Sequence, residues 1–172
     1  MQTEYILKAM DAALAAGKEI LNVYNDPSSD FQVERKADNS PLTLADRKAH
    51  ETIMTYLQET DYPVLSEEGK HLPYEKRAQW DTLWIVDPLD GTKEFIKRNG
   101  EFTVNIALVY EGIPVLGVIY LPVKQELYFA EESLGAYKLS GITALDDSAS
   151  LDKLVASSAV SYTHLRAHET PE

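Results

Sequence analysis

Apolar residues near the start of the chain recur every three or four positions, which is the spacing of one face of an α-helix. Residues Thr3–Tyr24 keep this spacing and predict an amphipathic helix. Turn-forming residues follow, and then the alternating stretch 31–34, which is typical of a short strand. A second apolar periodicity opens at Thr43 and runs to about Glu59, and Asp46, three positions after the threonine, nearly completes a capping box. The sequence therefore predicts a second helix that begins at Thr43.

Beyond the second helix the pattern changes to short apolar or alternating runs, which predict strands. They lie at 64–66, 83–87, 103–110, 113–121, 126–130 and 136–139, and a further strand is expected to begin at 154–158. Tight turns such as Glu111-Gly112 join several of them, which favours an antiparallel meander. We therefore expect an α+β fold, with two N-terminal helices packed on a mostly antiparallel sheet. Residues 70–81 are expected to be a mobile, charged connector, with Tyr74, Arg77 and Trp80 available to pack at its edge.

The run 83–87 is short enough for a buried strand, and it stops at an acid followed by Pro88. The turn after it carries a second acid, Asp90, and then Gly91, which permits backbone conformations that a β-branched residue cannot supply. Two carboxylates about 4 Å apart repel each other by about 4 kcal/mol at an effective dielectric constant near 20. A divalent cation would turn the two acids into ligands, and hard oxygen donors suit Mg²⁺. The amides of Gly91 and Thr92, at the start of a helix, would then hold a phosphate.

Each of these acidic motifs also has a plainer interpretation. An Asp-x-x-Asp-Gly sequence is equally typical of a proline-containing turn, in which Asp87 and Asp90 accept hydrogen bonds from nearby amides. The adjacent acids Glu67 and Glu68 are typical of a solvated loop, and Asp46 is typical of a helix cap. The residue types alone leave these alternatives open.

Composition narrows the classes of function. The 172 residues include 28 acidic and 16 basic side chains, a formal charge of −12, which argues against a nucleic-acid polymer as partner and suits a site that gathers cations. The chain has no cysteine, which excludes a disulfide framework, a thiolate nucleophile and a cysteine-based zinc site, and fits a reducing cytoplasm. Charged residues interrupt the first helix, and polar residues interrupt the longest apolar region, 104–121. We therefore expect neither a signal peptide nor a transmembrane segment.

The string from Trp84 to Phe95, Trp-Ile-Val-Asp-Pro-Leu-Asp-Gly-Thr-Lys-Glu-Phe, resembles the signature of the inositol monophosphatase-like, Mg²⁺-dependent, lithium-sensitive phosphatases. Its Lys-Glu-Phe ending is similar to that of their 3'(2'),5'-bisphosphate nucleotidase branch. Residues 36–38 and 40–46 resemble the family's N-terminal motif, and Glu67-Glu68 stands where the family has a glutamate pair. The resemblance extends over about residues 1–158. It implies the N-terminal part of a layered α/β/α/β/α sugar-phosphatase fold.

Carried over by position, the resemblance also assigns roles to single residues. The implied metal ligands, for Mg²⁺, are the side chains of Glu67, Asp87 and Asp90 and the backbone carbonyl of Leu89. The implied catalytic residues are Thr92, which would hydrogen-bond the attacking water, and Asp46, which would orient and activate it. The implied substrate-binding residues are Glu67, Leu89, Asp90, Gly91 and Thr92. Under this hypothesis Asp46 is catalytic, which does not exclude a capping role.

The activity that the resemblance implies is Mg²⁺-dependent removal of the 3'-phosphate of adenosine 3',5'-bisphosphate, giving AMP and phosphate in sulfur metabolism. The partner would be a small phosphorylated nucleotide, the oligomeric state stays open, and the expected location is cytoplasmic, with some members of the branch assigned to the cytoplasmic face of the inner membrane. The alternatives are an inositol or sugar phosphate phosphatase of the same superfamily and an inactive fragment that binds divalent ions.

Residues 1–158 are expected to form the N-terminal metal- and phosphate-binding domain. Residues 159–172 lack apolar periodicity and are expected to be a non-native tail. The family's C-terminal domain, which would supply one more aspartate ligand for the metal, is expected to be absent. A chain without that domain is expected to hydrolyse phosphate esters poorly.

Overall fold

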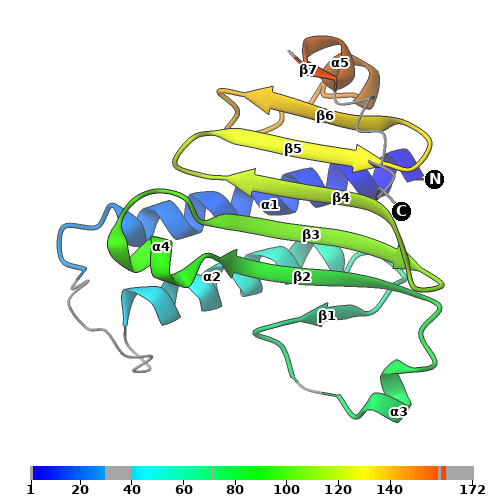
Figure 1. Cartoon of the computed structure of the whole chain (residues 1–172), viewed down its shortest axis with the longest axis horizontal. Coiled ribbons are helices and arrows are strands. Elements are labelled where there is room, and N and C mark those ends of the chain that lie inside the picture. Colours follow the sequence, from blue (N-terminus) through cyan, green and yellow to red (C-terminus); the bar gives the residue numbers. More distant parts are fainter. Residues whose placement is uncertain (1, 30–39, 71, 159, 162–172) are drawn as a thin grey trace, which may run out of the picture.

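The computed structural model describes residues 2–29, 40–70, 72–158 and 160–161. The strand expected at 31–34 and the first part of the N-terminal motif, 36–38, lie outside these ranges. Two helices and a sheet dominate the described part (Figure 1), and this is the α+β fold that the sequence predicts.

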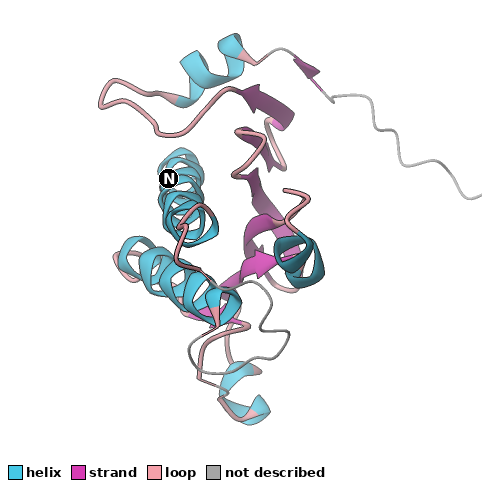
Figure 2. Ribbon diagram, turned by 90° about the vertical axis from the view of Figure 1, so that its left-hand side faces the viewer, coloured by secondary structure: helices cyan, strands magenta, loops and turns pink. Residues whose placement is uncertain are grey.

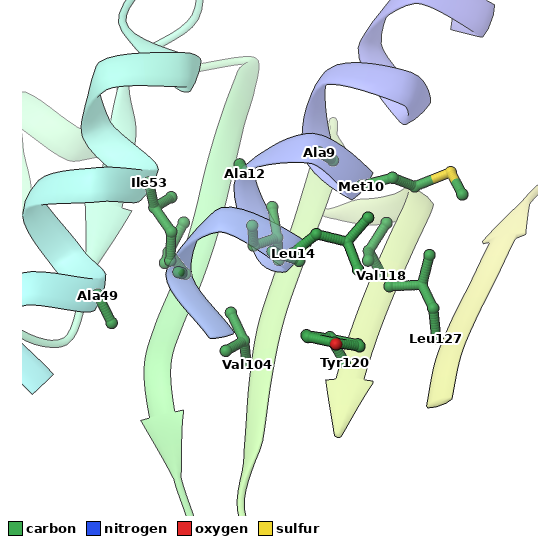
Figure 3. Close-up of a cluster of buried hydrophobic side chains, with 14 of the residues drawn as sticks. Ala9, Met10, Ala12, Leu14, Ala49, Ile53, Val104, Val118, Tyr120 and Leu127 are labelled. Carbon is green, nitrogen blue, oxygen red and sulfur yellow. The ribbon is translucent and has the colours of Figure 1, made fainter. Parts of the chain in front are cut away.

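Two long helices, α1 (Gln2–Tyr24) and α2 (Pro41–Leu57), contact each other and cover one face of the sheet (Figures 1 and 2). Alanines fill many of the contact positions: Ala9, Ala12, Ala13 and Ala16 of α1, and Ala45 and Ala49 of α2, are buried. Such small side chains let two helices and a sheet approach closely, and larger residues fill the remaining space. Met10 and Leu14 of α1 face Val118, Tyr120 and Leu127 of the sheet, while Ile53 of α2 lies beside α1 (Figure 3).

Within the described residues the sheet has seven strands in chain order, without a crossover: β1 (Val64–Ser66), β2 (Thr82–Asp90), β3 (Thr103–Tyr110), β4 (Ile113–Leu121), β5 (Glu126–Glu131), β6 (Gly135–Ser140) and β7 (Val160–Ser161). Every neighbouring pair is antiparallel except β1 and β2, which run parallel. Side chains alternate between the faces, so Val104, Ile106 and Leu108 of β3 point to the helices and are buried. The predicted meander is confirmed.

An aromatic cluster anchors the helix that follows β2, α4 (Thr92–Lys97), to α1. The rings of Tyr24, Phe95 and Phe102 lie with centroids 5.1 to 5.4 Å apart in tilted or edge-to-face pairs. Arg98, just after α4, stacks its guanidinium over the Tyr24 ring at 4.3 Å and donates a hydrogen bond to the Tyr24 carbonyl. Edge-to-face aromatic pairs add about 0.5–1.5 kcal/mol each to their burial. The cluster therefore fixes the segment that carries the signature acids.

The strand β2 does not stop at Asp87, as the sequence suggested, but continues through Pro88 to Asp90. Asp87 pairs with Asn105 and Asp90 with Thr103, so β2 advances three residues where β3 advances two. This one-residue β-bulge interrupts the hydrogen-bond ladder at the proline, which has no N–H to donate. The bulge explains how a strand accommodates a proline that normally ends one.

The start of α2 also differs from the prediction. The cap is Ser40, not Thr43, because Ser40 is extended, as a residue before proline should be, and Pro41 occupies the first helical position. The Ser40 hydroxyl accepts a hydrogen bond from the Thr43 amide at 3.1 Å. Asp46 therefore lies inside α2 and is not the acid of a capping box.

Two further expectations need correction. Residues 154–158 do not begin a strand: 154–157 complete the helix α5 (Leu151–Ser157), and Ser158 is its C-cap. The Ser150 side chain caps the first turn by accepting from the Lys153 amide. The connector 70–81 contains a short helix, α3 (Tyr74–Arg77). Tyr74 does not pack, since it is 71% exposed, whereas Arg77 and Trp80 are half-buried.

In the part of the chain that the structure describes, no helix has both the length and the apolar character needed to cross a membrane.

Replacing the Ser40 cap should destabilise the protein more than replacing Thr43. Ser40→Ala removes the acceptor for the Thr43 amide and should lower the free energy of unfolding by about 1 kcal/mol. Thr43→Ala leaves the cap in place and puts a better helix former inside α2. Urea unfolding of both variants measures the difference, and an equal or larger loss in Thr43→Ala would show that Thr43 caps the helix.

Candidate metal and phosphate site

The bulge at the end of β2 sets the directions of the signature residues. It leaves the Asp87 side chain half-buried and Asp90 exposed, with the Leu89 side chain buried between them. Gly91 follows with φ = +89°, a left-handed conformation that favours glycine, and an added Cβ would lie 3.3 Å from the Phe102 backbone. The glycine thus lets the chain turn from β2 directly into α4, with Thr92 as the first helical residue.

Glu67 reaches the same place through the parallel pairing of β1 with β2. Ser66 lies beside Val86 in the register, and the Glu67 amide donates to the Val86 carbonyl at 3.2 Å. Ser66 is itself buried, and its hydroxyl lies 2.8 Å from Nδ1 of His50 on α2. This hydrogen bond ties the end of β1 to α2, so the position of Glu67 is set by two elements.

The three acids interact electrostatically. The pKa of Asp87 is raised from 3.8 to about 6, first by burial and then by the negative charges of Glu67 and Asp90. The Glu67 and Asp87 carboxyls also lie within hydrogen-bonding reach of each other, which contributes to the raised pKa of Asp87. The structure therefore confirms that the signature acids lie close enough to repel, as the spacing predicts.

The donor chemistry of this group fits a hard divalent cation. Its side chains offer only carboxylate oxygens, and a cation would relieve the repulsion that raises the pKa of Asp87. The geometry is incomplete, however: across residues 2–29, 40–70, 72–158 and 160–161, no three acidic or histidine side chains converge closely enough to hold a metal ion. The carboxylates are thus the type of ligand that Mg²⁺ prefers, and they lie near one another. Glu67 and Asp90 are both exposed to solvent.

The two residues predicted to activate water come from different helices. Asp46 is buried in the second turn of α2, with 8% of its surface exposed. Aspartate side chains are rarely buried unless they are paired with another group, so its burial is consistent with a functional or structural partner. Thr92 is half-buried at the start of α4, and α2 contacts α4. The fold therefore brings the helices that carry Asp46 and Thr92 into contact.

A hollow of about 970 Å³ borders Glu67 and Asp87 and extends across the sheet face that α1 and α2 leave open. The alternation of the strands shows which face this is: Ile85 and Ile119 are 43% and 46% exposed, while their neighbours Trp84 and Val118 are buried against the helices. The remaining wall is mostly apolar, with Tyr128 and Tyr137 among its residues. The acids thus lie at the border of a large concave surface, as ligand sites commonly do.

The sequence reading missed Asn105, which donates from Nδ2 to Asp90 Oδ2 at 3.1 Å and borders the same hollow. A polar residue interrupts the apolar run 103–110 at this position, and that interruption was a usable signal. His50 was also missed, since nothing in its sequence neighbourhood points to Ser66.

Comparisons with known proteins agree with this description. The model of the family described as "Inositol monophosphatase family" matches residues 1–172. A protein of Escherichia coli (strain K12) named 3'(2'),5'-bisphosphate nucleotidase CysQ is 56% identical over 119 residues, which are 68% of this chain and 48% of the relative. The protein of the same name from Salmonella typhimurium is 54% identical over 119 residues, again 68% of this chain and 48% of the relative. The chain spans about half the length of the curated relatives it matches.

Solved structures show the same fold. The crystal structure of CysQ from Bacteroides thetaiotaomicron, described as a bacterial member of the inositol monophosphatase family, has 63% sequence identity and a TM-score of 0.87, covering 91% of this chain and 56% of that one. An inositol monophosphatase from Anabaena (Nostoc) sp. PCC 7120 has 27% identity and a TM-score of 0.64, covering 80% of this chain and 47% of the other. The predicted family and fold are thereby confirmed.

Asp87→Asn should stabilise the metal-free protein near neutral pH and leave its stability unchanged near pH 4. The folded state keeps the Asp87 proton up to about pH 6, and the unfolded chain releases it near 3.8, so the native protein loses stability as the pH rises through this window. The full shift would correspond to about 3 kcal/mol, which solvent screening of a half-buried group reduces to about 1 kcal/mol. That is about 2–4 °C in Tm at pH 7.5.

Thermal melts at both pH values, in chelator, measure this effect, with Asp147→Asn as the control for an exposed aspartate that has no site neighbours. A stabilisation of equal size at pH 4 and pH 7.5 would show that charge repulsion is not its cause.

Proposed function

The chain belongs to the inositol monophosphatase family, and we propose that it acts as a Mg²⁺-dependent 3'(2'),5'-bisphosphate nucleotidase. The observation that carries the proposal is that Glu67 and Asp87 border the hollow, with Asp90 near enough to Asp87 to help raise its pKa to about 6. The choice of a nucleotide as substrate is supported by the identity, above half of the aligned residues, to relatives named for that activity. The substrate is then adenosine 3',5'-bisphosphate, and the products are AMP and phosphate.

In this proposal the ligands of Mg²⁺ are the side chains of Glu67, Asp87 and Asp90 and the carbonyl of Leu89. Bound there, Mg²⁺ would offset phosphate charge, lower the pKa of the attacking water and steady the leaving oxygen. The chain's own contribution is to hold the acids on a bulged strand between two neighbours, so that they keep their positions as the charge on the substrate changes. Loss of the Asp87 proton would accompany metal binding.

The phosphate is proposed to lie against the amides of Gly91 and Thr92, bordered by Glu67, Leu89 and Asp90. The left-handed conformation of Gly91 supports this role, because it turns the chain there into the first turn of α4. The Thr92 hydroxyl would also hydrogen-bond the attacking water. Asp46 would act as the acceptor that orients and activates this water. Burial of Asp46 and contact between its helix and α4 support this arrangement.

Residues 1–158 are proposed to be the unit that carries this metal and phosphate site, and a cytoplasmic location belongs to the same proposal. A second candidate function is hydrolysis of an inositol phosphate, because solved inositol monophosphatases share the fold, the one from Anabaena at 27% identity. A third is binding of divalent ions without turnover, which the incomplete convergence of the acids favours. The substrate assay separates all three.

We expect phosphate release from adenosine 3',5'-bisphosphate to exceed release from inositol 1-phosphate, and to stop when Mg²⁺ is withdrawn. Asp90→Asn should lower the rate by about 100-fold or more, because one charged ligand is lost, while the fold survives. Since the chain spans about half of its relatives, the assay uses both this chain and a chimera extended by the matching remainder of the Escherichia coli relative. Preference for inositol 1-phosphate would support the inositol phosphatase function. Mg²⁺ binding without turnover in both proteins would support the function of binding divalent ions alone.

If Asp46 and Thr92 activate water as one unit, their effects on catalysis should not be additive. Asp46→Asn and Thr92→Ala should each lower kcat by about 10²–10⁴-fold, and the double variant should lose little more than either single one. The measurement is kcat of the four proteins in the active form from the substrate assay. If the fold-losses in kcat of the two single variants multiply in the double variant, the two residues do not act as one unit. Normal kcat in Asp46→Asn would show that Asp46 has a structural role only.

A further inference from the structure

Asn105 is a polar residue of β3 that faces the open side of the sheet beside the acids. Its neighbours along the strand, Val104 and Ile106, are buried against the helices, so Asn105 points to the opposite face and borders the hollow with Glu67 and Asp87. Apolar side chains would suit the middle of a strand better. An amide at this position therefore calls for a reason beyond packing.

The side chain of Asn105 spans two of the three acids. Its position in the register is directly opposite Asp87, and its Nδ2 donates a hydrogen bond to Oδ2 of Asp90 at 3.1 Å. Cross-strand partners have Cβ atoms about 4.5–5.5 Å apart, which puts the amide next to the Asp87 carboxyl as well. Asn105 thus lies between the residues at the two ends of the bulge.

The chemistry of the Asp90 contact fixes the orientation of the amide. An ionised carboxylate only accepts hydrogen bonds, so Nδ2 must face Asp90 and the carbonyl oxygen Oδ1 must face away from it. This Oδ1 is buried and has no hydrogen-bond partner among the described residues. A buried acceptor without a donor costs about 1–3 kcal/mol, which makes such an atom rare and worth explaining.

We propose that Asn105 is a positioning residue of the metal site. Its N–H group holds the Asp90 carboxylate beside Asp87, where a divalent cation would bind both acids. The unsatisfied Oδ1 is the cost of keeping the N–H group directed at Asp90. This inference rests on the proposed function and adds to it a residue that touches neither phosphate nor metal directly.

The role predicts a specific loss when the amide is replaced by an apolar side chain of similar size. Asn105→Leu should weaken Mg²⁺ binding by about 10–100-fold, the range found for partners that orient metal ligands. Its metal-free Tm should not fall, because the change removes an unsatisfied buried acceptor. The rise in Tm on adding Mg²⁺ should shrink in parallel with the affinity.

The experiment titrates Mg²⁺ alone into the 172-residue chain by calorimetry and repeats the melts with and without the ion. Tyr128→Phe is the matched control: Tyr128 also borders the hollow, but its hydroxyl bonds to Glu126 and to none of the three acids. Asn105→Ala serves as a second variant if the leucine perturbs folding, with the same weakening expected.

The outcomes separate the two levels of the proposal. Weaker Mg²⁺ binding in the folded Asn105 variants, with Tyr128→Phe unchanged, supports the positioning role. Mg²⁺ affinity within twofold of the parent in those variants overturns it and leaves the proposed function standing. A parent chain that binds no Mg²⁺ at any concentration tested contradicts the metal-dependent function itself, and the role of Asn105 with it.

Discussion

The structure depends on holding like charges together at the end of one strand. Burial, and then repulsion from Glu67 and Asp90, raises the pKa of Asp87 from 3.8 to about 6, so the protein keeps a proton there well above the usual range. A flexible loop would relax by letting the acids separate. The strand β2 cannot relax in this way, because β1 and β3 pair with it on both sides. Its own side chains Trp84 and Val86 are also buried against the helices. The apolar layer under the sheet thus sustains an electrostatic arrangement that a cation would complete.

Local pattern was enough to predict most of the fold. The spacing of apolar residues in 3–24 and the alternation in 103–121 reflect burial on one face, which the finished structure preserves. The family resemblance, carried by the string 84–95 and by Glu67, gave the candidate site, and the structure adds that Glu67 and Asp90 lie near enough to Asp87 to raise its pKa. The assigned roles of Asp46, Thr92 and the metal ligands remain predictions.

The features that the sequence reading missed depend on contacts between distant segments or on competition between neighbouring signals. Ser40 outcompetes Thr43 as a cap because Pro41 is available for the first helical position. Pro88 stays within β2 because the bulge removes the need for its N–H. The parallel pairing of β1 and the contact of Asn105 with Asp90 exist only once the strands have assembled, so no pattern within either strand encodes them.

The packing of α1 on the middle of the sheet has a consequence for how the chain folds. Gly17 lies so close to Tyr120 that an added Cβ would fall 2.5 Å from the ring, and the Tyr120 hydroxyl is bonded to Ile142. Both helices precede the sheet in the chain, so they can bury their apolar faces only after the strands that they pack on have emerged from the ribosome. Until then the nascent chain exposes two helix faces rich in alanine and leucine.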